Sequence, residues 1–378
     1  MTTTFTQMKN AAHERVCYHY DKETGLCAII AIHSTTLGPA LGGTRRWHYN
    51  SESNGLNDVL RLSEGMTYKA AAANLPMGGA KSIILTPTPN HIPTEKEARA
   101  MGKFVDTFKG TYIAAEDVGV DTKFVDWMAL ETNHVMGGEV VSRGGDPSPY
   151  TAKGVFEGLC ASLNHQNIAS KNMDGLHVAI QGIGHVGWKL AKNVVEAGGR
   201  VSVADIDVEA VDHCVEHLGA TPLDINEILT CECDVLAPCA LGGVISSKNI
   251  SHLKCKIICG GANNILVNPE TDSTLLKDAG ITYAPDFVVN AGGLIQLAGL
   301  WLGYSEKELE QKNSDIYQTT LTILETSSSN NISTYEAALD LAQMRIEKKS
   351  NQCGTGCGCN SKEKSLPENA VIGNFDAN

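Results

Sequence analysis

Two lysines, Lys69 and Lys81, lie in a stretch of small and apolar residues and could do acid–base chemistry. Lysine is seldom fully buried without a partner, and burial beside a second cation lowers the pKa of a lysine towards neutrality. A neutral lysine can serve as a general base. In the alternative, the aliphatic parts of both side chains pack on apolar surface while the ammonium groups reach water. The residue types alone leave both interpretations open.

An acidic pair, Glu116 and Asp117, directly follows the apolar segment 113–115. Carboxylates at the end of an apolar strand could hold an ammonium group, because opposite charges stabilise each other at short range. They could equally cap the N-terminus of a following helix by accepting backbone N–H groups. Taken alone, the pair favours the cap.

A glycine-rich turn of the G-x-G-x-x-G type occupies residues 182–187, with the sequence Gly182-Ile183-Gly184-His185-Val186-Gly187. It follows an apolar strand and precedes a helical pattern, which is the context in which this motif binds a dinucleotide. Gly182 allows the tight turn, Gly184 lets the backbone approach the pyrophosphate, and Gly187 lets helix and strand pack closely. The helix N-terminus adds free N–H groups and a positive dipole. A turn that binds nothing is the alternative, and the context favours the dinucleotide.

The next strand ends at Asp205, at the spacing where an acidic residue accepts the ribose hydroxyls. A carboxylate there repels the extra phosphate of NADP, so the sequence favours NAD as the cofactor. The neighbouring Asp207 and the geometry of the loop can alter this preference, which leaves NADP as the alternative.

These residues need strands and helices to position them. Apolar runs predict strands at 28–33 and 82–85, and the spacing of apolar residues predicts helices at 56–74 and 94–108. Thr94 is expected to be the N-cap of the last of these helices, and Glu97 is expected to complete a capping box with it.

A Gly/Pro/Ser-rich passage at 137–149 is the best candidate for a hinge, and after it strands alternate with helices. The strands of this second half are expected at 178–180, 201–204, 235–237, 256–259 and 282–284. Such alternation predicts a parallel sheet with helices on both faces. From about residue 292 to residue 346 the chain reads as mostly helical.

The chain is therefore predicted to be an α/β protein of two domains. Residues 1–140 would form an α/β substrate-binding and oligomerisation domain, with 331–347 packing back on it. Residues 141–330 would form a Rossmann-type, doubly wound NAD-binding domain. Residues 348–378 are poor in apolar side chains and are expected to be a disordered tail that contains cysteines.

Composition narrows the class of protein. A chain of 378 residues with a formal net charge of −13 suits a two-domain protein that acts on small molecules and argues against nucleic acid as a partner. No apolar run is long enough to span a membrane, and the first residues lack the apolar core of a signal peptide, so a cytoplasmic protein is expected.

Twelve cysteines and one histidine motif raise the question of metal binding. Nine cysteines are scattered as reduced thiols would be, while Cys353, Cys357 and Cys359 in the tail could bind a soft metal or exchange disulfides, or could be incidental. The segment His213–His217 fits H-x-x-E-H, but its helix would turn both histidines towards solvent, so the match is interpreted as chance. No metal site is predicted.

Seven motifs in chain order carry a resemblance to a known family. They are Gly38-Pro39-Ala40-Leu41-Gly42-Gly43-Thr44-Arg45, Gly65-Met66-Thr67-Tyr68-Lys69, Gly78-Gly79-Ala80-Lys81, Glu116-Asp117-Val118-Gly119, Ala237-Pro238-Cys239-Ala240-Leu241-Gly242, Ala262-Asn263-Asn264 and Asn290-Ala291-Gly292-Gly293. The set resembles the glutamate/leucine/phenylalanine/valine dehydrogenase family, and its leucine dehydrogenase branch most closely. The resemblance runs from about residue 28 to residue 346.

The resemblance implies oxidative deamination of an L-amino acid to a 2-oxo acid and ammonia, with NAD as hydride acceptor. Lys69 and the backbone of Gly42 would grip the substrate carboxylate, Lys81 would activate water, and Asp117 would handle protons at the amino group. The base must lie beside a cationic carbon and must therefore be neutral. Lys81 would meet this need, because the positive charge of Lys69 and poor solvation would keep it partly unprotonated. Thr151 and Asn290 match family positions near the nicotinamide, and Asn263 and Asn264 would lie at the lip of the cleft.

The side chain of the substrate would be chosen by Leu41, Ala115, Leu294 and Leu297. All four are apolar, which disfavours glutamate because its second carboxylate would go unpaired. Leu294 and Leu297 are bulkier than the valines expected in leucine dehydrogenases, so leucine, valine and phenylalanine or another aromatic amino acid remain candidates. A non-catalytic NAD-sensing regulator is a further alternative. The resemblance also implies a homo-oligomer, from a dimer upwards, with an octamer among the options.

Overall fold

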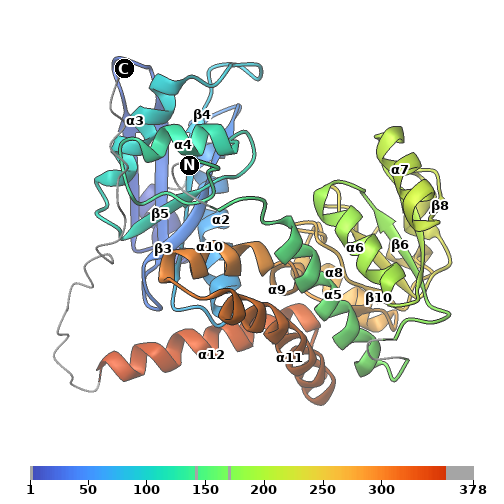
Figure 1. Ribbon diagram of the computed structural model, residues 1–378. Coiled ribbons are helices and arrows are strands. Elements are labelled where there is room, and N and C mark those ends of the chain that lie inside the picture. Colours follow the sequence, from blue (N-terminus) through green and yellow to red (C-terminus); the bar gives the residue numbers. More distant parts are fainter. Residues whose placement is uncertain (1–2, 141–143, 169–171, 355–378) are drawn as a thin grey trace.

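The computed structural model describes residues 3–140, 144–168 and 172–354, and it contains two β-sheets in separate halves of the molecule (Figure 1). In these residues no helix is long and apolar enough to cross a membrane.

The first sheet has five strands in the order β1-β2-β4-β3-β5. The strands are β1 (Arg15–Tyr20), β2 (Cys27–Ser34), β3 (Ala40–Trp47), β4 (Gly78–Leu85) and β5 (Tyr112–Ala115). β2 runs antiparallel to β1 and β4, whereas β3 runs parallel to β4 and β5. Through β3, the middle of β4 lies level with the end of β5, so that residues near 81 and 117 come close together although they are distant in sequence.

Helices cover both faces of this sheet. α2 (Glu52–Ala72) packs on one face, where Val59 meets Ile29 and Ile83. α3 (Glu95–Asp106) and α4 (Thr122–Ala129) pack on the other face through Met101 and Phe124. The short α1 (Thr4–Asn10) precedes β1.

The expected helix at 94–108 is present, with Thr94 as its N-cap, but the capping box is not completed. Thr94 accepts the N–H of Glu97, while the Glu97 carboxylate turns to the buried guanidinium of Arg46, with Nε–Oε1 at 3.1 Å. A buried cation needs its counter-ion more than an exposed helix end needs a second cap, and this explains why the prediction for Glu97 was wrong.

The second sheet has six parallel strands in the order β11-β10-β9-β6-β7-β8. They are β6 (His177–Gln181), β7 (Arg200–Ala204), β8 (Thr221–Pro222), β9 (Val235–Pro238), β10 (Ile257–Ile258) and β11 (Thr282–Tyr283). α5 (Ser148–His165), α6 (His185–Glu196) and α7 (Val208–Leu218) cover one face, and α8 (Pro269–Asp278) covers the other. The predicted doubly wound α/β domain is confirmed.

Three late helices pack across the two halves of the chain, and two of them, the first and the last, return to the first half. α10 (Gly292–Leu302) follows the short α9 (Asp286–Val289) and packs Leu294 and Ile295 against Leu41 and Ile113 of the first sheet. α11 (Glu306–Asn330) runs along α5, and α12 (Thr334–Gly354) lies across α2 (Figure 1). The return to the first sheet thus begins earlier in the chain than residues 331–347.

The prediction of a tail that is disordered from Lys348 onwards was wrong for its first residues. α12 continues through Lys348 to Gly354, because a polar stretch extends a helix whose inner face, with Ala337 and Ala338, is already anchored. Cys357, Cys359 and the rest of the expected tail lie outside the described residues, as does the side chain of Cys353.

Candidate active site

The two halves of the molecule meet at a cavity of about 450 Å³. Its walls include most of the side chains singled out from the sequence, although these come from distant segments. They are Leu41, Gly42, Lys69, Lys81, Ala115, Asp117, Thr151, Val186, Asn263, Asn264, Asn290, Leu294 and Leu297.

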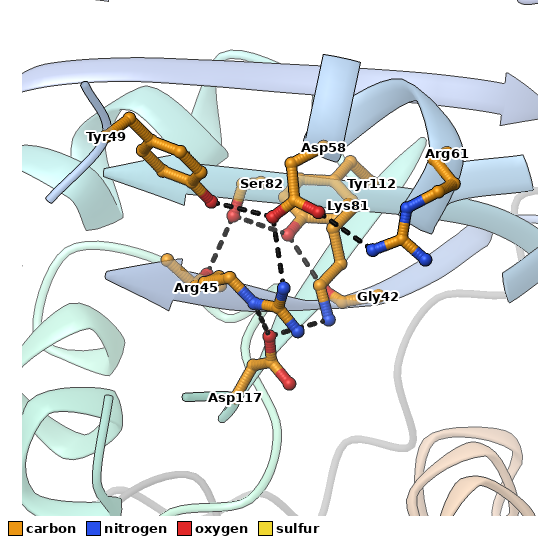
Figure 2. A network of polar contacts seen from close by, with 10 residues as sticks. Gly42, Arg45, Tyr49, Asp58, Arg61, Lys81, Ser82, Tyr112 and Asp117 are labelled. Carbon is orange, nitrogen blue, oxygen red and sulfur yellow. Dashed lines mark hydrogen bonds and ion pairs between the residues drawn. The ribbon is translucent and has the colours of Figure 1, made fainter. Parts of the chain in front are cut away.

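Lys81 and Asp117 form an ion pair in this cavity, with Nζ and Oδ2 3.0 Å apart (Figure 2). Lys81 lies on β4, and Asp117 follows β5, so β3 separates the two strands. The pair can meet because β3 carries glycines there. A Cβ atom at Gly42 would lie 1.7 Å from the carbonyl oxygen of Ala80, and one at Gly43 would lie 2.4 Å from that of Glu116.

Gly42 is held by a chain of buried hydroxyl groups. The Tyr112 hydroxyl donates to the carbonyl oxygen of Gly42 at 2.8 Å and also contacts the Ser82 hydroxyl, which in turn contacts Thr44 (Figure 2). The carbonyl of Gly42 is therefore satisfied from behind by a side chain, which fixes the peptide that faces the cavity.

Burial lowers the pKa of Lys81, and the carboxylate of Asp117 opposes that shift. A further lowering comes from the positive charge of Arg45. The sequence interpretation assigned this repulsion to Lys69 alone, whereas the guanidinium of Arg45 shares the Asp117 carboxylate with Lys81. Arg45 stands within the first of the seven motifs, but nothing local in the sequence shows which carboxylate it meets.

The carboxylate of Asp117 remains ionised because two cations hold it. Its pKa is lowered below the ordinary value by Lys81 and Arg45, which together outweigh the opposing effect of burial. Arg45 Nε lies 2.9 Å from Oδ2, the same oxygen that Lys81 contacts. Figure 2 shows the other carboxylate oxygen turned away from both cations.

Lys69 approaches the cavity from the last turn of α2 and donates to Oδ1 of Asn290 at 2.7 Å. The amide of Asn290 is oriented by donation to Oδ1 of Asn263 at 2.9 Å. Burial lowers the pKa of Lys69 to about 8, the buried carboxylate of Asp286 opposes this shift, and Lys81 adds to it. The sequence interpretation did not single out Asp286, because its role appears only when α9 is placed beside α2.

The apolar lining of the cavity includes Leu41, Ala115, Leu294 and Leu297, together with Met66, which the sequence interpretation did not select. Leu41, Ala115 and Leu294 are buried, and their apolar side chains offer no partner to a charged substrate side chain. Met66 lies on α2 one turn before Lys69, so helical spacing could have indicated it.

The glycine-rich turn meets the cavity at Val186. Gly182 has φ +96°, and a Cβ atom at Gly187 would lie 1.9 Å from the carbonyl oxygen of Gly182, so both positions require glycine. Gly184 is different, because a Cβ atom there would have no neighbour within 4 Å. α6 begins at His185 without a side-chain cap, so its first N–H groups remain available to a ligand. This open, uncapped turn fits the pyrophosphate of a dinucleotide.

Asp205 lies beside this turn, at the end of β7. Its Oδ2 accepts the N–H of Ile183 at 2.5 Å, and its Oδ1 accepts that of Asp207 at 3.0 Å. A carboxylate has about four acceptor positions, so both oxygens can still accept ribose hydroxyls. Thr151 lines the cavity from α5 and donates to the carbonyl oxygen of Pro147 at 3.1 Å.

The histidines of the H-x-x-E-H motif lie apart from the cavity on α7. Their rings are in tilted contact, with centroids 4.0 Å apart, and the ring of His213 also contacts that of Trp188. Within residues 3–140, 144–168 and 172–354, no group of three or more His, Cys, Asp or Glu side chains could hold a metal ion.

Known proteins share this arrangement. Residues 13–134 match the family described as Glu/Leu/Phe/Val dehydrogenase, dimerisation domain, and residues 202–354 match Glutamate/Leucine/Phenylalanine/Valine dehydrogenase. The chain belongs to this dehydrogenase family. The resemblance stated from the seven motifs is thereby confirmed, and the chain is an oxidoreductase of the amino-acid dehydrogenase class that uses a nicotinamide cofactor.

Relatives with different substrate names are similar to this chain to nearly the same degree. A leucine dehydrogenase of Geobacillus stearothermophilus is 44% identical over 91% of this chain and 93% of the relative. An L-tryptophan dehydrogenase of Nostoc punctiforme is 40% identical over 90% of this chain and 96% of the relative. The crystal structure of L-tryptophan dehydrogenase from Nostoc punctiforme superimposes with a TM-score of 0.82 and covers 92% of this chain and 99% of that one.

Proposed function

We propose that this dehydrogenase catalyses the reversible, NAD-dependent oxidative deamination of a branched-chain L-amino acid, such as leucine or valine, to the 2-oxo acid and ammonia. The observation that carries the proposal is the convergence of Lys69, Lys81 and Asp117 on one cavity whose side-chain wall is apolar. The similarity to the leucine dehydrogenase of Geobacillus stearothermophilus supports the same substrate class.

Lys69 binds the substrate carboxylate in this proposal, with the backbone at Gly42 beside it. A protonated lysine is a compact charge with three donors, of which one is used by Asn290. The amide of Asn290 therefore aims the ammonium group into the cavity, and the carboxylate fixes the α-carbon relative to the cofactor.

Lys81 acts as the general base, and Asp117 exchanges protons with the amino group of the substrate. When bound, the nicotinamide accepts the hydride that leaves the α-carbon. Water then attacks the resulting iminium carbon, and Lys81 takes the proton of this water. Burial lowers the pKa of Lys81, which favours the neutral form that a base beside a cationic carbon needs. Asp117 is ionised before the proton exchange, because Lys81 and Arg45 lower its pKa, and it can then hold the ammonium group of the substrate.

The cofactor is held by the turn 182–187, with Thr151 and Asn290 near the nicotinamide and Asn263 and Asn264 at the lip of the cleft. NAD is proposed over NADP because the Asp205 carboxylate would repel a 2′-phosphate. A homo-oligomer is also proposed, since the first half of the chain matches a domain described by its role in dimerisation.

An aromatic L-amino acid is the second candidate substrate, favoured by the similarity to the L-tryptophan dehydrogenase of Nostoc punctiforme. Steady-state rates for leucine, valine, isoleucine, phenylalanine and tryptophan, each with NAD and with NADP, separate the two candidates. We expect the highest kcat/KM with a branched-chain substrate and NAD. A higher kcat/KM for phenylalanine or tryptophan would refute the branched-chain assignment.

The variant Lys81→Ala tests the catalytic assignment and the alternative of a non-catalytic regulator. We expect Lys81→Ala to bind NADH as the parent does, measured by NADH fluorescence, and to lose nearly all deamination. If the parent binds NADH but turns over no amino acid, the chain is a regulator. If Lys81→Ala retains near-normal kcat, Lys81 is not the base.

A further inference from the structure

A second pair of charged side chains, Arg45 and Asp58, lies next to the ion pair of Lys81 and Asp117 and has no role in the reaction proposed above. Arg45 on β3 contacts Asp117 through Nε and Asp58 through Nη1, at 2.9 and 3.0 Å (Figure 2). Asp58 lies on α2, so the guanidinium bridges the loop after β5 and the helix that also carries Lys69. The side chains of Arg45 and Asp58 are only 22% and 18% exposed, which limits solvent screening.

Asp58 is itself fixed on both oxygens. The Tyr49 hydroxyl donates to Oδ2 at 2.8 Å, and Nη2 of Arg61 lies 2.9 Å from Oδ1. Oδ2 thus accepts from Tyr49 and from Arg45 together. With its partner held in this way, the guanidinium of Arg45 contacts Asp58 through Nη1 and directs its Nε at Asp117.

We propose that Arg45 and Asp58 are positioning residues of opposite sign that orient Asp117 and balance the charge around Lys81. This inference rests on the proposed role of Lys81 as the base. Arg45 holds Oδ2 of Asp117, so that the second carboxylate oxygen is left to the amino group of the substrate. Its positive charge also favours the neutral form of Lys81, while the negative charge of Asp58 favours the protonated form.

Other charged groups around Lys81 do not duplicate this arrangement. Asp117 contacts Lys81 directly from the loop after β5, and Lys69 faces it from α2. Glu116 precedes Asp117, and burial together with nearby carboxylates raises its pKa. Substitution of Arg45 or Asp58 therefore changes the charge near Lys81 while Lys69, Lys81 and Asp117 themselves stay in place.

The two substitutions have opposite expected effects on the pH profile of deamination. Below the pKa of its base, kcat falls about tenfold per pH unit, which gives an acid limb. In Arg45→Gln the loss of a positive charge moves this limb to higher pH by about one unit. In Asp58→Asn the loss of a negative charge moves it to lower pH. Both variants also lower the plateau of kcat, because Asp117 is less well oriented.

The experiment measures kcat for leucine with NAD from pH 6 to pH 11 in the full-length parent and in each variant. Arg45→Lys keeps the charge without the two-pronged contact, so we expect it to restore the position of the limb but not the plateau. Arg99→Gln and Asp106→Asn are matched controls on α3, whose side chains form exposed ion pairs, and they should leave the profile unchanged. NADH fluorescence and thermal melting confirm that each variant folds and binds cofactor.

A limb that shifts in opposite directions in Arg45→Gln and Asp58→Asn supports the proposal. A limb that stays in place in both variants, or that moves the same way in both, overturns it and assigns the two residues a structural role. If the proposed role of Lys81 as the base is wrong, the result is different. Lys81→Ala would then retain activity, whatever the pH profiles of the Arg45 and Asp58 variants.

Discussion

At the scale of single residues, the properties of the site depend on which buried carboxylate or amide each cation contacts. Lys81 and Arg45 both contact one oxygen of Asp117, whereas Lys69 has the amide of Asn290 as its hydrogen-bonding partner and the charge of Asp286 nearby. The two lysines are therefore not equivalent. The difference agrees with the proposed roles, in which Lys81 beside a carboxylate transfers a proton and Lys69 beside a neutral amide binds the substrate carboxylate.

The pKa of Lys69, lowered to about 8, predicts how carboxylate binding depends on pH. The ammonium form that binds a carboxylate prevails below pH 8 and is lost as the pH rises through this value. We expect the inhibition constant of 4-methylpentanoate, which has the carboxylate of leucine's carbon skeleton but no amine, to be lowest below pH 8 and to rise above it. Inhibition of deamination measured from pH 6.5 to pH 9.5 checks this.

The variant Asp286→Asn sharpens the test, because the carboxylate of Asp286 opposes the lowering of the Lys69 pKa. Without it the pKa falls further, so the inhibition constant should start to rise at a lower pH than in the parent. Asp278→Asn, an exposed change on α8, is the matched control. An inhibition constant that is flat to pH 9.5 in the parent would show that Lys69 does not bind the carboxylate.

At the scale of elements, glycines determine how closely a neighbouring strand, helix or ligand can approach the backbone. Two of the three glycines in the motif 182–187 differ in their surroundings: Gly187 lies in the first turn of α6, and Gly184 directly precedes this helix. A Cβ atom at Gly187 would collide with the carbonyl oxygen of Gly182, whereas one at Gly184 would meet open space. The first glycine serves the packing of α6 on β6, and the second keeps room for a ligand.

This difference predicts distinct outcomes for two alanine variants. We expect Gly184→Ala to keep the Tm of the parent and to weaken NADH binding by about tenfold or more, since only the ligand meets the new methyl group. We expect Gly187→Ala to lower the Tm as well, because helix and strand must move apart. Thermal melting and NADH titration measure both effects. Unaltered NADH affinity in Gly184→Ala would contradict a pyrophosphate at this turn.

Elements were easier to predict from the sequence than their partners. The turn at 182–187 is a local pattern, and the strands on either side of it appear where apolar runs predict them. Lys69, Lys81 and Asp117 were found through motifs that keep their order along the chain. Arg45 and Asp58 were not found, because their contact depends on how β3 and α2 pack. Glu97 shows the same limit, since a local capping rule was overridden by a buried arginine.

At the scale of the whole molecule, the C-terminal helix returns to the substrate side of the cavity. α12 lies across α2 and contributes Tyr335 and Leu339 to the cavity wall. Its Arg345 donates through Nη1 to the carbonyl oxygens of Ala71 and Ala72, at 3.0 and 2.5 Å. These carbonyls end α2, so a cation from the last helix caps the helix that carries Lys69.

Arg345→Gln is therefore expected to disturb substrate binding from a distance. The loss of a charged donor at two helix-terminal carbonyls costs about 1.5–3 kcal/mol and should lower the Tm by about 3 °C or more. Because the released turn carries Lys69, the KM for leucine should rise while NADH affinity stays unchanged. Arg345→Lys keeps the charge and should recover part of both losses, and Arg99→Gln serves as an exposed control. A lower Tm with an unchanged KM would show that the contacts of Arg345 stabilise the fold without positioning Lys69.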